Sequence, residues 1–270
     1  MESARYGIRR RGAGWHDEFA AGLADPETLL RGEDVRFLKQ EPGGRAVALV
    51  TIAATRLVVK AYDESRAKHL LQSLVEGSAA ARAARGIDRI AAAGLHGPQL
   101  VAVVEPAAFL KRRSWLVTVA LDGVSPDVGW LQLSEAQRIR VATTLGTALR
   151  TMHARGVYPQ DARSANWLLV RDRQEPVLVD LDRVRLYRRI SWRRRMKNLA
   201  QLHRDLFRGG GPGEVAFAAA YAGSEDPAVV EDVRSRIVEH SSAMDARVAR
   251  RGAARERRAK RAEQAAPVQR

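Results

Sequence analysis

Residues 153–170 read HARGVYPQDARSANWLLV, and residues 177–182 read VLVDLD. Asp161 and Asn166 lie on a polar loop, and the apolar runs that follow this loop predict two short strands. Asp180 comes directly after the second run. The stretch therefore predicts a loop that carries Asp161 and Asn166 beside a strand pair that ends in Asp180.

The segments on either side of the loop fit the same arrangement. Ser134 can cap a helix that continues to about His153 with apolar side chains on one face, and Gly156 can end it. The polar residues 171–176 predict a turn between the two strands. Helix, Asp-x4-Asn loop, strand, turn and strand ending in aspartate is the order found around a kinase catalytic loop.

The chemistry of phosphoryl transfer explains these residue types. The reaction needs an acceptor hydroxyl held in line and a metal that neutralises the phosphates. Asp161 would accept the hydroxyl proton, and Asn166 and Asp180 would offer the amide and carboxylate oxygens that Mg²⁺ prefers. Asp182 shares a strand face with Asp180, but Asp180 directly follows the apolar strand, so we assign the metal to Asp180.

The N-terminal half predicts a small β-rich lobe. Its expected elements are strands within 35–62, a helix over 64–93, and strands at 100–105 and 114–121. Lys60 ends one strand about a hundred residues before Asp161, where a kinase places the lysine that holds the α- and β-phosphates. We therefore predict an α+β, protein-kinase-like two-lobed fold with a small β-rich N-lobe and a mostly helical C-lobe.

Composition marks the expected domain boundaries. The turn-rich residues 122–127 suit a hinge, so 1–121 would be the N-terminal lobe and 122–240 the C-terminal lobe. The C-terminal lobe is expected to be helical after the strand pair, with a break at the glycine-rich residues 209–213. Residues 241–270 hold nine Lys or Arg against three Asp or Glu and no aromatic residue, which predicts a basic tail, disordered or a solvated helix.

The composition excludes several classes of protein. With 46% apolar residues over 270 positions, the chain is not disordered throughout. The absence of cysteine excludes disulfides, thiolate metal sites and a cysteine nucleophile, and suits a reducing cytoplasm. We expect neither a secretory signal nor a spanning helix, because basic residues near the N-terminus precede no apolar region and no run of about 18 apolar residues occurs.

The net charge of +15 favours anionic partners, namely an anionic or lipid-linked saccharide and an anionic membrane surface. Six of the ten residues 188–197 are basic, so Arg193, Arg194 and Arg195 are predicted to contact the acceptor or the membrane. No aromatic stacking motif is interleaved with the basic residues, so no specific nucleic acid is expected. We expect a cytoplasmic protein, peripheral on the inner face of the cell membrane.

Three stretches resemble the lipopolysaccharide kinase (Kdo/WaaP) family of the protein-kinase-like superfamily. They are the lysine strand at 57–62, the basic helix and glycine turn at 79–98, and the Asp-x-Asp-Arg segment with its following helix at 177–204. The resemblance covers roughly residues 35–208. It implies a kinase that uses ATP and Mg²⁺ to phosphorylate heptose or Kdo in the inner core of lipopolysaccharide, at the cytoplasmic face of the inner membrane.

By the same resemblance Lys60 binds ATP, Asp161 is the catalytic base, and Asn166 and Asp180 hold the metal. Some features depart from the family pattern. Pro159 stands where a histidine is usual, and residues 42–45 are the nearest equivalent of a glycine-rich loop.

The helix glutamate that should pair with Lys60 is also missing from its expected place, where alanines stand, and Glu76 or Asp88 would have to replace it. Two alternatives stay open. One is a small-molecule kinase of the aminoglycoside or choline type, which shares the Asp-x4-Asn loop. The other is a pseudokinase that serves as a membrane-surface binding module.

Overall fold

The computed structural model describes most of the chain. The described residues are 6–41, 45–65, 67–107, 113–171 and 176–265. Most of the predicted turn at 171–176 and of the segment 42–45 lies outside them. None of the helices in the described part of the chain combines the length and the apolar character needed to cross a bilayer.

The chain packs into two compact units, here called unit 1 (residues 1–129 with 151–190) and unit 2 (residues 130–150 with 191–270). The lobe boundaries expected from composition remain a prediction. The strands of unit 1 are β1 (Tyr6–Arg11), β2 (Arg36–Glu41), β3 (Arg45–Ile52), β4 (Thr55–Asp63), β5 (Leu100–Pro106), β6 (Arg113–Val119), β7 (Gly123–Val124), β8 (Val157–Pro159), β9 (Trp167–Val170), β10 (Val177–Leu178) and β11 (Val184–Leu186).

The helices fall in both units. Unit 1 holds α1 (Phe19–Gly22), α2 (Pro26–Leu29), α3 (Ala67–Glu76), α4 (Ala79–Ala92), α5 (Pro126–Gly129) and a 3₁₀ turn at Ser164–Asn166. Unit 2 holds a 3₁₀ turn at Trp130–Gln132, α7 (Trp192–Leu202), a π-helical turn at His203–Phe207, α8 (Pro212–Ala222) and α9 (Pro227–Ala265). Helix α6 (Glu135–Ala154) contributes residues to both units.

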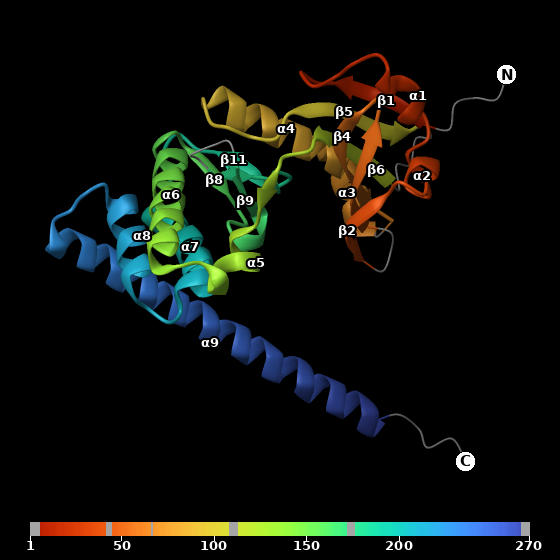
Figure 1. Ribbon diagram of the computed structural model, residues 1–270. Helices are drawn as coiled ribbons and strands as arrows, with labels where there is room; N and C mark the ends of the chain where they lie inside the picture. The colour runs from red at the N-terminus through yellow and green to blue at the C-terminus, as the bar shows by residue number, and fades with distance from the viewer. Residues whose placement is uncertain (1–5, 42–44, 66, 108–112, 172–175, 266–270) are drawn as a thin grey trace. The chain divides into compact units, whose positions relative to one another are not determined.

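Unit 1 is built on an antiparallel sheet with the strand order β1-β5-β6-β4-β3-β2 (Figure 1). The predicted strands β2 to β6 are confirmed. In β4 the side chains of Leu57, Val59 and Ala61 enter the core, where they meet Phe19 of α1. Because successive side chains of a strand point to opposite faces, Lys60 lies on the other face.

Strand β1 was not predicted. Its sequence, YGIRRR, holds three arginines, and only Tyr6 is buried. It forms because it pairs with β5 at one edge of the sheet and because Tyr6 packs edge-on against Trp115, with ring centroids 5.0 Å apart. Long-range pairing therefore decides this element, and the local pattern carries little signal.

The single helix expected over 64–93 is divided into α3 and α4. Gly77 has a φ of +76°, a conformation that favours glycine and ends α3. Ser78 then caps α4 by accepting a hydrogen bond from the amide of Ala81 at 3.0 Å. The buried carboxylate of Glu64 accepts a second amide, that of Ala79, at 3.0 Å.

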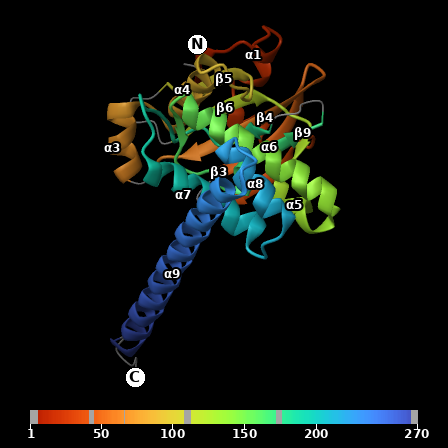
Figure 2. The ribbon, with the colours of Figure 1, turned by 90° about the vertical axis from the view of Figure 1, so that its left-hand side faces the viewer.

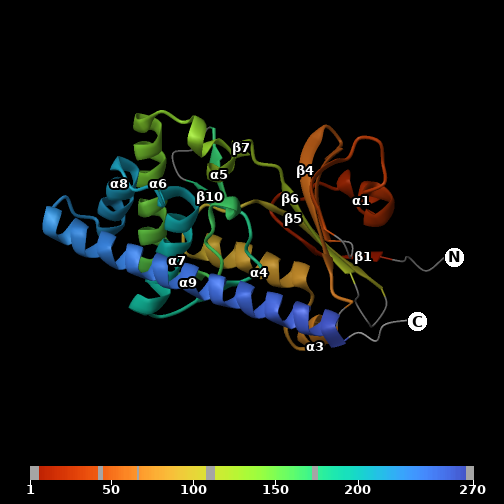
Figure 3. The ribbon, with the colours of Figure 1, turned by 90° about the horizontal axis from the view of Figure 1, so that it is seen from below.

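Helix α4 lies along β5 and β6 and also contacts β11 (Figure 3). At Gly86 it approaches the backbone so closely that a Cβ atom would come 2.0 Å from the carbonyl oxygen of Leu181. Leu181 lies between Asp180 and Asp182. This contact therefore fixes the distance between α4 and the segment that carries both aspartates.

The segment around Asp161 is held by short strand pairs. β9 pairs with β10 and with β7, and β8 pairs with β11. The predicted strands at 167–170 and 177–179 are confirmed, but the helical pattern expected directly after Asp180 is interrupted by β11. Strand β11 has only three residues and forms because it pairs with β8, so no local sequence pattern predicts it.

Unit 2 is helical, and α7 and α8 both pack against α9 (Figure 2). The helix predicted from Ser134 to His153 is confirmed as α6, and Ser134 and Gln137 exchange hydrogen bonds in a reciprocal cap. Helix α9 is 39 residues long, so the basic tail is helical as far as Ala265. Figure 2 shows its C-terminal part extending beyond α7 and α8.

Candidate active site

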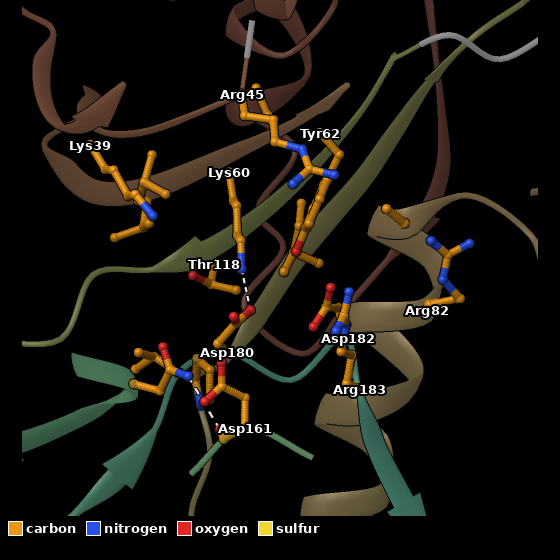
Figure 4. Close-up of a pocket in the computed structure, with 18 of the residues that line it drawn as sticks. Lys39, Arg45, Lys60, Tyr62, Arg82, Thr118, Asp161, Asp180, Asp182 and Arg183 are labelled. Atoms are coloured by element: carbon orange, nitrogen blue, oxygen red, sulfur yellow. Dashed lines mark hydrogen bonds and ion pairs between the residues drawn. The ribbon is translucent and has the colours of Figure 1, made fainter. Parts of the chain in front are cut away.

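An open cleft of about 1730 Å³ lies within unit 1 (Figure 4). The predicted residues Lys60, Asp161, Asn166 and Asp180 all line it. Figure 4 shows the side chains of Lys60 and Asp180 meeting in the cleft, with Asp161 beneath them. Residues that are up to 120 positions apart in sequence are therefore brought together, as the sequence analysis expected.

Lys60 and Asp180 form an ion pair. Their side chains are 25% and 33% exposed, so the pair is screened from bulk water only in part. Burial by itself lowers the pKa of the Lys60 ammonium, but interactions with Tyr62, Asp180 and Asp182 outweigh burial and raise the pKa above the usual value for lysine. Lys60 is therefore a fixed cation, as a ligand of phosphate groups has to be.

Asp161 is held by Arg163, which is two residues further along the loop. The Nε and Nη2 atoms of Arg163 each donate to one carboxylate oxygen of Asp161 at 3.0 Å. Burial raises the pKa of Asp161, but the hydrogen bonds and charge of Arg163 dominate and leave the pKa below its usual value. Asp161 is therefore ionised at neutral pH, which a general base requires.

Asn166 is tied to both aspartates. Its side-chain Nδ2 donates to the backbone carbonyl of Asp161 at 3.2 Å, and its own backbone carbonyl accepts from the amide of Val179 at 2.9 Å. Val179 directly precedes Asp180, so the backbone of the loop and of the metal-binding segment are joined at this point. Because Nδ2 is the donor in the first bond, the amide oxygen of Asn166 is left to face other groups.

The donor set fits Mg²⁺. No group of three or more His, Cys, Asp or Glu that could hold a metal occurs among the residues that the structure describes. Mg²⁺ does not need such a cage, because it retains several waters and binds through one or two protein carboxylates together with substrate phosphates. Asn166 and Asp180 would supply one amide and one carboxylate oxygen.

Asp182 has a different environment from Asp180. Burial and the neighbouring charge of Asp180 raise its pKa above the usual value, although Lys60 and Arg183 act in the opposite direction. The interaction of Asp182 with Arg183 is electrostatic, and Arg185 lies 4.0 Å from Glu76. A carboxylate with a raised pKa gives up its proton less readily to a metal. The raised pKa of Asp182 therefore supports the assignment of the metal to Asp180, which remains a prediction.

The two candidate partners for Lys60 are engaged elsewhere. Glu76 accepts a hydrogen bond from Gln72 at 2.9 Å. Asp88 accepts two hydrogen bonds from Arg10, at 2.6 and 2.7 Å. Among the described residues, Asp180 is the carboxylate that forms an ion pair with Lys60.

Backbone pairing secures the loop at the position where a histidine is usual. Pro159 stands opposite Val184 in the β8–β11 pair. The amide of Gln160, next along the chain, donates to the carbonyl of Arg183 at 3.4 Å. The missing side-chain hydrogen bonds of a histidine are thus replaced by contacts between main-chain groups.

The predicted contact residues Arg193, Arg194 and Arg195 belong to α7 of unit 2 and are not among the residues that line the cleft. Arg193 and Arg194 are exposed, whereas Arg195 is partly buried beside Tyr221. Burial raises the pKa of Tyr221 to about 12, although the charge and hydrogen bond of Arg195 act against this rise. Arg195 therefore has a structural contact with Tyr221.

Sequence reasoning missed two residues of the cleft, Arg163 and Tyr62. Both had a signal. Arg163 is the basic residue nearest to Asp161 on the same loop, and Tyr62 is two positions from Lys60 on a strand, so both side chains of β4 point to the same face. The Lys60 ammonium lies 5.2 Å from the centre of the Tyr62 ring, within the range of a cation–π contact.

Comparisons with known proteins bear on the family and the fold. The model of the lipopolysaccharide kinase (Kdo/WaaP) family matches residues 32–221. No curated protein matches the chain. Three solved structures are similar to it: WaaP in complex with acyl carrier protein (TM-score 0.58, 19% identity, 84% of this chain and 98% of that one), WbdD (0.49, 16%, 76% and 45%), and the PknI kinase domain of Mycobacterium tuberculosis (0.42, 16%, 77% and 96%).

The likeness to WaaP shows the fold, so the predicted protein-kinase-like α+β class is confirmed. The family model covers well over half of the chain and contains all four residues that meet in the cleft. The family prediction is therefore confirmed as well. The chain belongs to the lipopolysaccharide kinase (Kdo/WaaP) family, whose members are kinases that phosphorylate sugar hydroxyls of the lipopolysaccharide core.

Proposed function

We propose that this chain transfers a phosphoryl group from ATP to a sugar hydroxyl of the lipopolysaccharide core, or of a similar lipid-linked anionic saccharide. The convergence of Lys60, Asp161, Asn166 and Asp180 in one cleft carries the proposal. Membership of the family supports a saccharide acceptor over the small-molecule acceptors of aminoglycoside- or choline-type kinases.

Each residue has a distinct role in this proposal. Lys60 leaves its ion pair with Asp180 and binds the α- and β-phosphates. Asp180 and Asn166 hold Mg²⁺, which when bound neutralises charge on the phosphates. Asp161 accepts the proton of the attacking sugar hydroxyl, for which its carboxylate must turn from Arg163 toward the acceptor.

We further propose that the protein works in the cytoplasm, peripherally on the inner face of the cell membrane. The net charge of +15 supports attraction to anionic lipid. The exposed side chains of Arg193 and Arg194 on α7 are the proposed contacts, together with the basic C-terminal part of α9.

The test is a transfer assay with γ-labelled ATP, Mg²⁺ and a deacylated core oligosaccharide. We expect label to enter the oligosaccharide, with transfer lost when EDTA removes the metal and restored when Mg²⁺ is added back. Label that appears only as inorganic phosphate would argue against a sugar acceptor. Absence of any ATP turnover, at every oligosaccharide concentration, would remove the enzymatic proposal.

A pseudokinase is the second candidate, and one observation favours it. In an active protein kinase the lysine corresponding to Lys60 pairs with a glutamate of the neighbouring helix. Here α4 brings Arg82, Arg85 and Arg89 to the cleft, and Lys60 pairs with Asp180. Binding of oligosaccharide or anionic vesicles without any turnover of ATP would favour this candidate over the kinase.

A further inference from the structure

Three arginines of α4 line one wall of the cleft. Arg82, Arg85 and Arg89 are spaced by three and four residues, which places them on one face of the helix. The opposite face of α4 is apolar and buried, with Ala83 and Ile87 among its residues. The arginines therefore cannot turn away from the cleft by rotation of the helix.

The arginine side chains are held in place by main-chain groups. Each guanidinium donates to a carbonyl oxygen: Arg82 to Gly77 at 2.6 Å, Arg85 to Glu76, and Arg89 to Val184 at 2.7 Å. A carbonyl oxygen accepts a hydrogen bond but carries no net charge. These contacts therefore fix the guanidinium groups and leave their positive charge available to an anion.

The carboxylates of this wall are already used. Glu64 accepts hydrogen bonds from the amide of Ala79 and the hydroxyl of Ser114, both at 3.0 Å, and lies farther from Arg82, at 3.8 Å. Glu76 accepts from Gln72 at 2.9 Å. Glu76 and Asp182 also act electrostatically on these arginines. The wall keeps an excess of positive charge because five arginines face three carboxylates there: Arg82, Arg85, Arg89, Arg183 and Arg185 against Glu64, Glu76 and Asp182.

Tyr62 adds an independent observation. Its side chain lines the same cleft and the residue is only 6% exposed, yet its hydroxyl makes no hydrogen bond of normal geometry within the part of the chain that the structure describes. The cation beside it is the Lys60 ammonium, whose interaction with the hydroxyl lowers the pKa of Tyr62 against the effect of burial. Buried hydroxyl groups are rarely left without a partner, and an exception calls for a ligand or a water. Figure 4 shows Tyr62 and Arg82 on the same side of the cleft, with Asp182 between them and the loop.

We propose that Arg82, Arg85 and Arg89, together with the hydroxyl of Tyr62, form a subsite for a phosphate group that the acceptor saccharide already carries. The inference rests on the proposed function, because it specifies the acceptor of the same cleft. Guanidinium groups match phosphate oxygens in geometry and charge, and a neutral hydroxyl completes the set of donors. The substrate class is thus a saccharide phosphorylated before it reaches this protein.

The nucleotide is the other source of phosphate in the cleft. Its phosphates are already matched by Lys60 and by the metal that Asn166 and Asp180 would hold, and the metal neutralises much of their charge. The nucleotide phosphates therefore do not need three further arginines to balance their charge. The three arginines therefore suit a second, separate anion.

Arg85 and Tyr62 are the residues to change. All three arginines donate to backbone carbonyls, but Arg85 is the exposed one, so its replacement is expected to disturb the packing of α4 least. The probes are a deacylated, phosphorylated core oligosaccharide, the same oligosaccharide after chemical removal of its phosphates, and Mg·ATP. Binding of each probe to the full chain is measured by calorimetry for the parent, Arg85→Gln, Tyr62→Phe and, as a charge control, Arg31→Gln.

We expect the parent to bind the phosphorylated oligosaccharide at least about tenfold more tightly than the dephosphorylated one, a factor that corresponds to about 1.4 kcal/mol. Arg85→Gln should remove most of this preference, while Arg31→Gln retains it. Tyr62→Phe should weaken the preference without lowering the melting temperature, because it deletes a hydroxyl that forms no hydrogen bond of normal geometry among the described residues. A purely structural role for Tyr62 would lower the melting temperature instead.

Three results would overturn the subsite. They are a parent that binds both oligosaccharides equally, a preference that survives in Arg85→Gln, and a loss in Arg85→Gln that falls on Mg·ATP in place of the oligosaccharide. None of these measurements requires turnover. A parent that binds the phosphorylated oligosaccharide through Arg85 but never phosphorylates it would keep the subsite and remove the proposed kinase activity.

Discussion

The ammonium of Lys60 forms an ion pair with the carboxylate of Asp180 across 120 positions of sequence. The residue proposed to hold the phosphates is thus paired with the residue proposed to hold the metal. The two charges neutralise each other, and both side chains are partly shielded from water. Binding of Mg·ATP would separate the two side chains and give each an opposite charge from the ligand.

The pair predicts a measurable coupling. In urea unfolding of Lys60→Met, Asp180→Asn and the double variant, we expect a coupling free energy of about 1 kcal/mol, toward the low end for contacting charges because both groups are partly exposed. The double variant should therefore lose less stability than the two single variants together. Strict additivity would contradict a significant ion pair in solution.

Asp180 and Asp161 should fail in different ways. Asp180→Ala is expected to abolish transfer and most of the Mg²⁺-dependent affinity for ATP, because the metal loses its carboxylate. Asp161→Ala should retain that affinity and lower the rate by about 10²-fold or more, the usual contribution of a general base. Calorimetry with Mg·ATP and the transfer assay separate the two effects.

Near-full activity in both variants would end the kinase assignment. Asp182→Ala is the matched control for Asp180→Ala, since it removes a carboxylate from the same segment. If Asp182→Ala lost the metal-dependent affinity and Asp180→Ala kept it, the metal assignment would pass to Asp182.

Gly86 should not tolerate a side chain. In Gly86→Ala the new methyl group would come 2.0 Å from the carbonyl oxygen of Leu181, so α4 and the Asp180–Asp182 segment have to separate. We expect a loss of about 1–3 kcal/mol in the free energy of unfolding, and lower activity with it. Urea unfolding and the transfer assay measure both.

Gly252→Ala is the control, because this glycine lies in α9 with no atom near the place of a new Cβ. It should gain about 0.5–1 kcal/mol from the better helix propensity of alanine. Equal stability of Gly86→Ala and the parent would show that α4 packs less tightly on Leu181 than described.

The raised pKa of Asp182 predicts that the stability of the fold depends on pH. Its pKa is raised in the folded protein, so the fold loses stability as the pH rises from the usual value near 3.8 through the raised pKa. Asp182→Asn removes this penalty. The variant should therefore melt at a higher temperature than the parent at pH 7, and the difference should shrink as the pH falls toward about 3.8.

Thermal melts across this pH range make the comparison, with Asp34→Asn as an exposed control that is expected to leave the curve unchanged. A variant that melts below the parent at pH 7 would mean that the ionised form of Asp182 stabilises the fold through its neighbours.

The basic surface of α7 should bind anionic membranes. Each Lys or Arg near such a surface contributes about 1 kcal/mol, and salt weakens the attraction because the Debye length falls from about 10 Å at 0.1 M to about 3 Å at 1 M. Arg195 is best left in place because it contacts Tyr221. Neutralising Arg193 and Arg194 to glutamine should markedly reduce sedimentation with phosphatidylglycerol vesicles at low salt.

Neutralising Arg31 and Arg140, which are also exposed, removes the same charge elsewhere and should have a smaller effect. Equal vesicle binding by both double variants would mean that net charge alone explains the attraction and that α7 has no specific role.

The sequence predicted the parts of the site that local spacing encodes. Asp161, Asn166 and Asp180 lie within twenty residues on a loop and strand pair whose apolar runs are plain, and Lys60 follows a run of β-branched and aliphatic residues. The strand of Lys60 was expected to end there, but β4 continues to Asp63. These elements were found where they were expected. Their convergence in one cleft followed from the order of the elements.

What the sequence could not supply depends on contacts between distant residues. The partner of Lys60 is decided by the approach of two segments far apart in the chain. Strands β1 and β11 exist through their pairing with β5 and β8. The break between α3 and α4 is different, because Gly77 followed by Ser78 is a local signal that could have been recognised.

Unit 1 is built from two separate segments of the chain, because residues 130–150, which lie between them in sequence, belong to unit 2. On a ribosome that adds about 5–20 residues per second, the six-stranded sheet and α4 emerge seconds before the segment that carries Asp161 and Asp180. Until then the face of α4 around Gly86 has no Leu181 to cover it. A nascent chain interrupted before residue 190 is thus no partial enzyme but a client for chaperones and proteases.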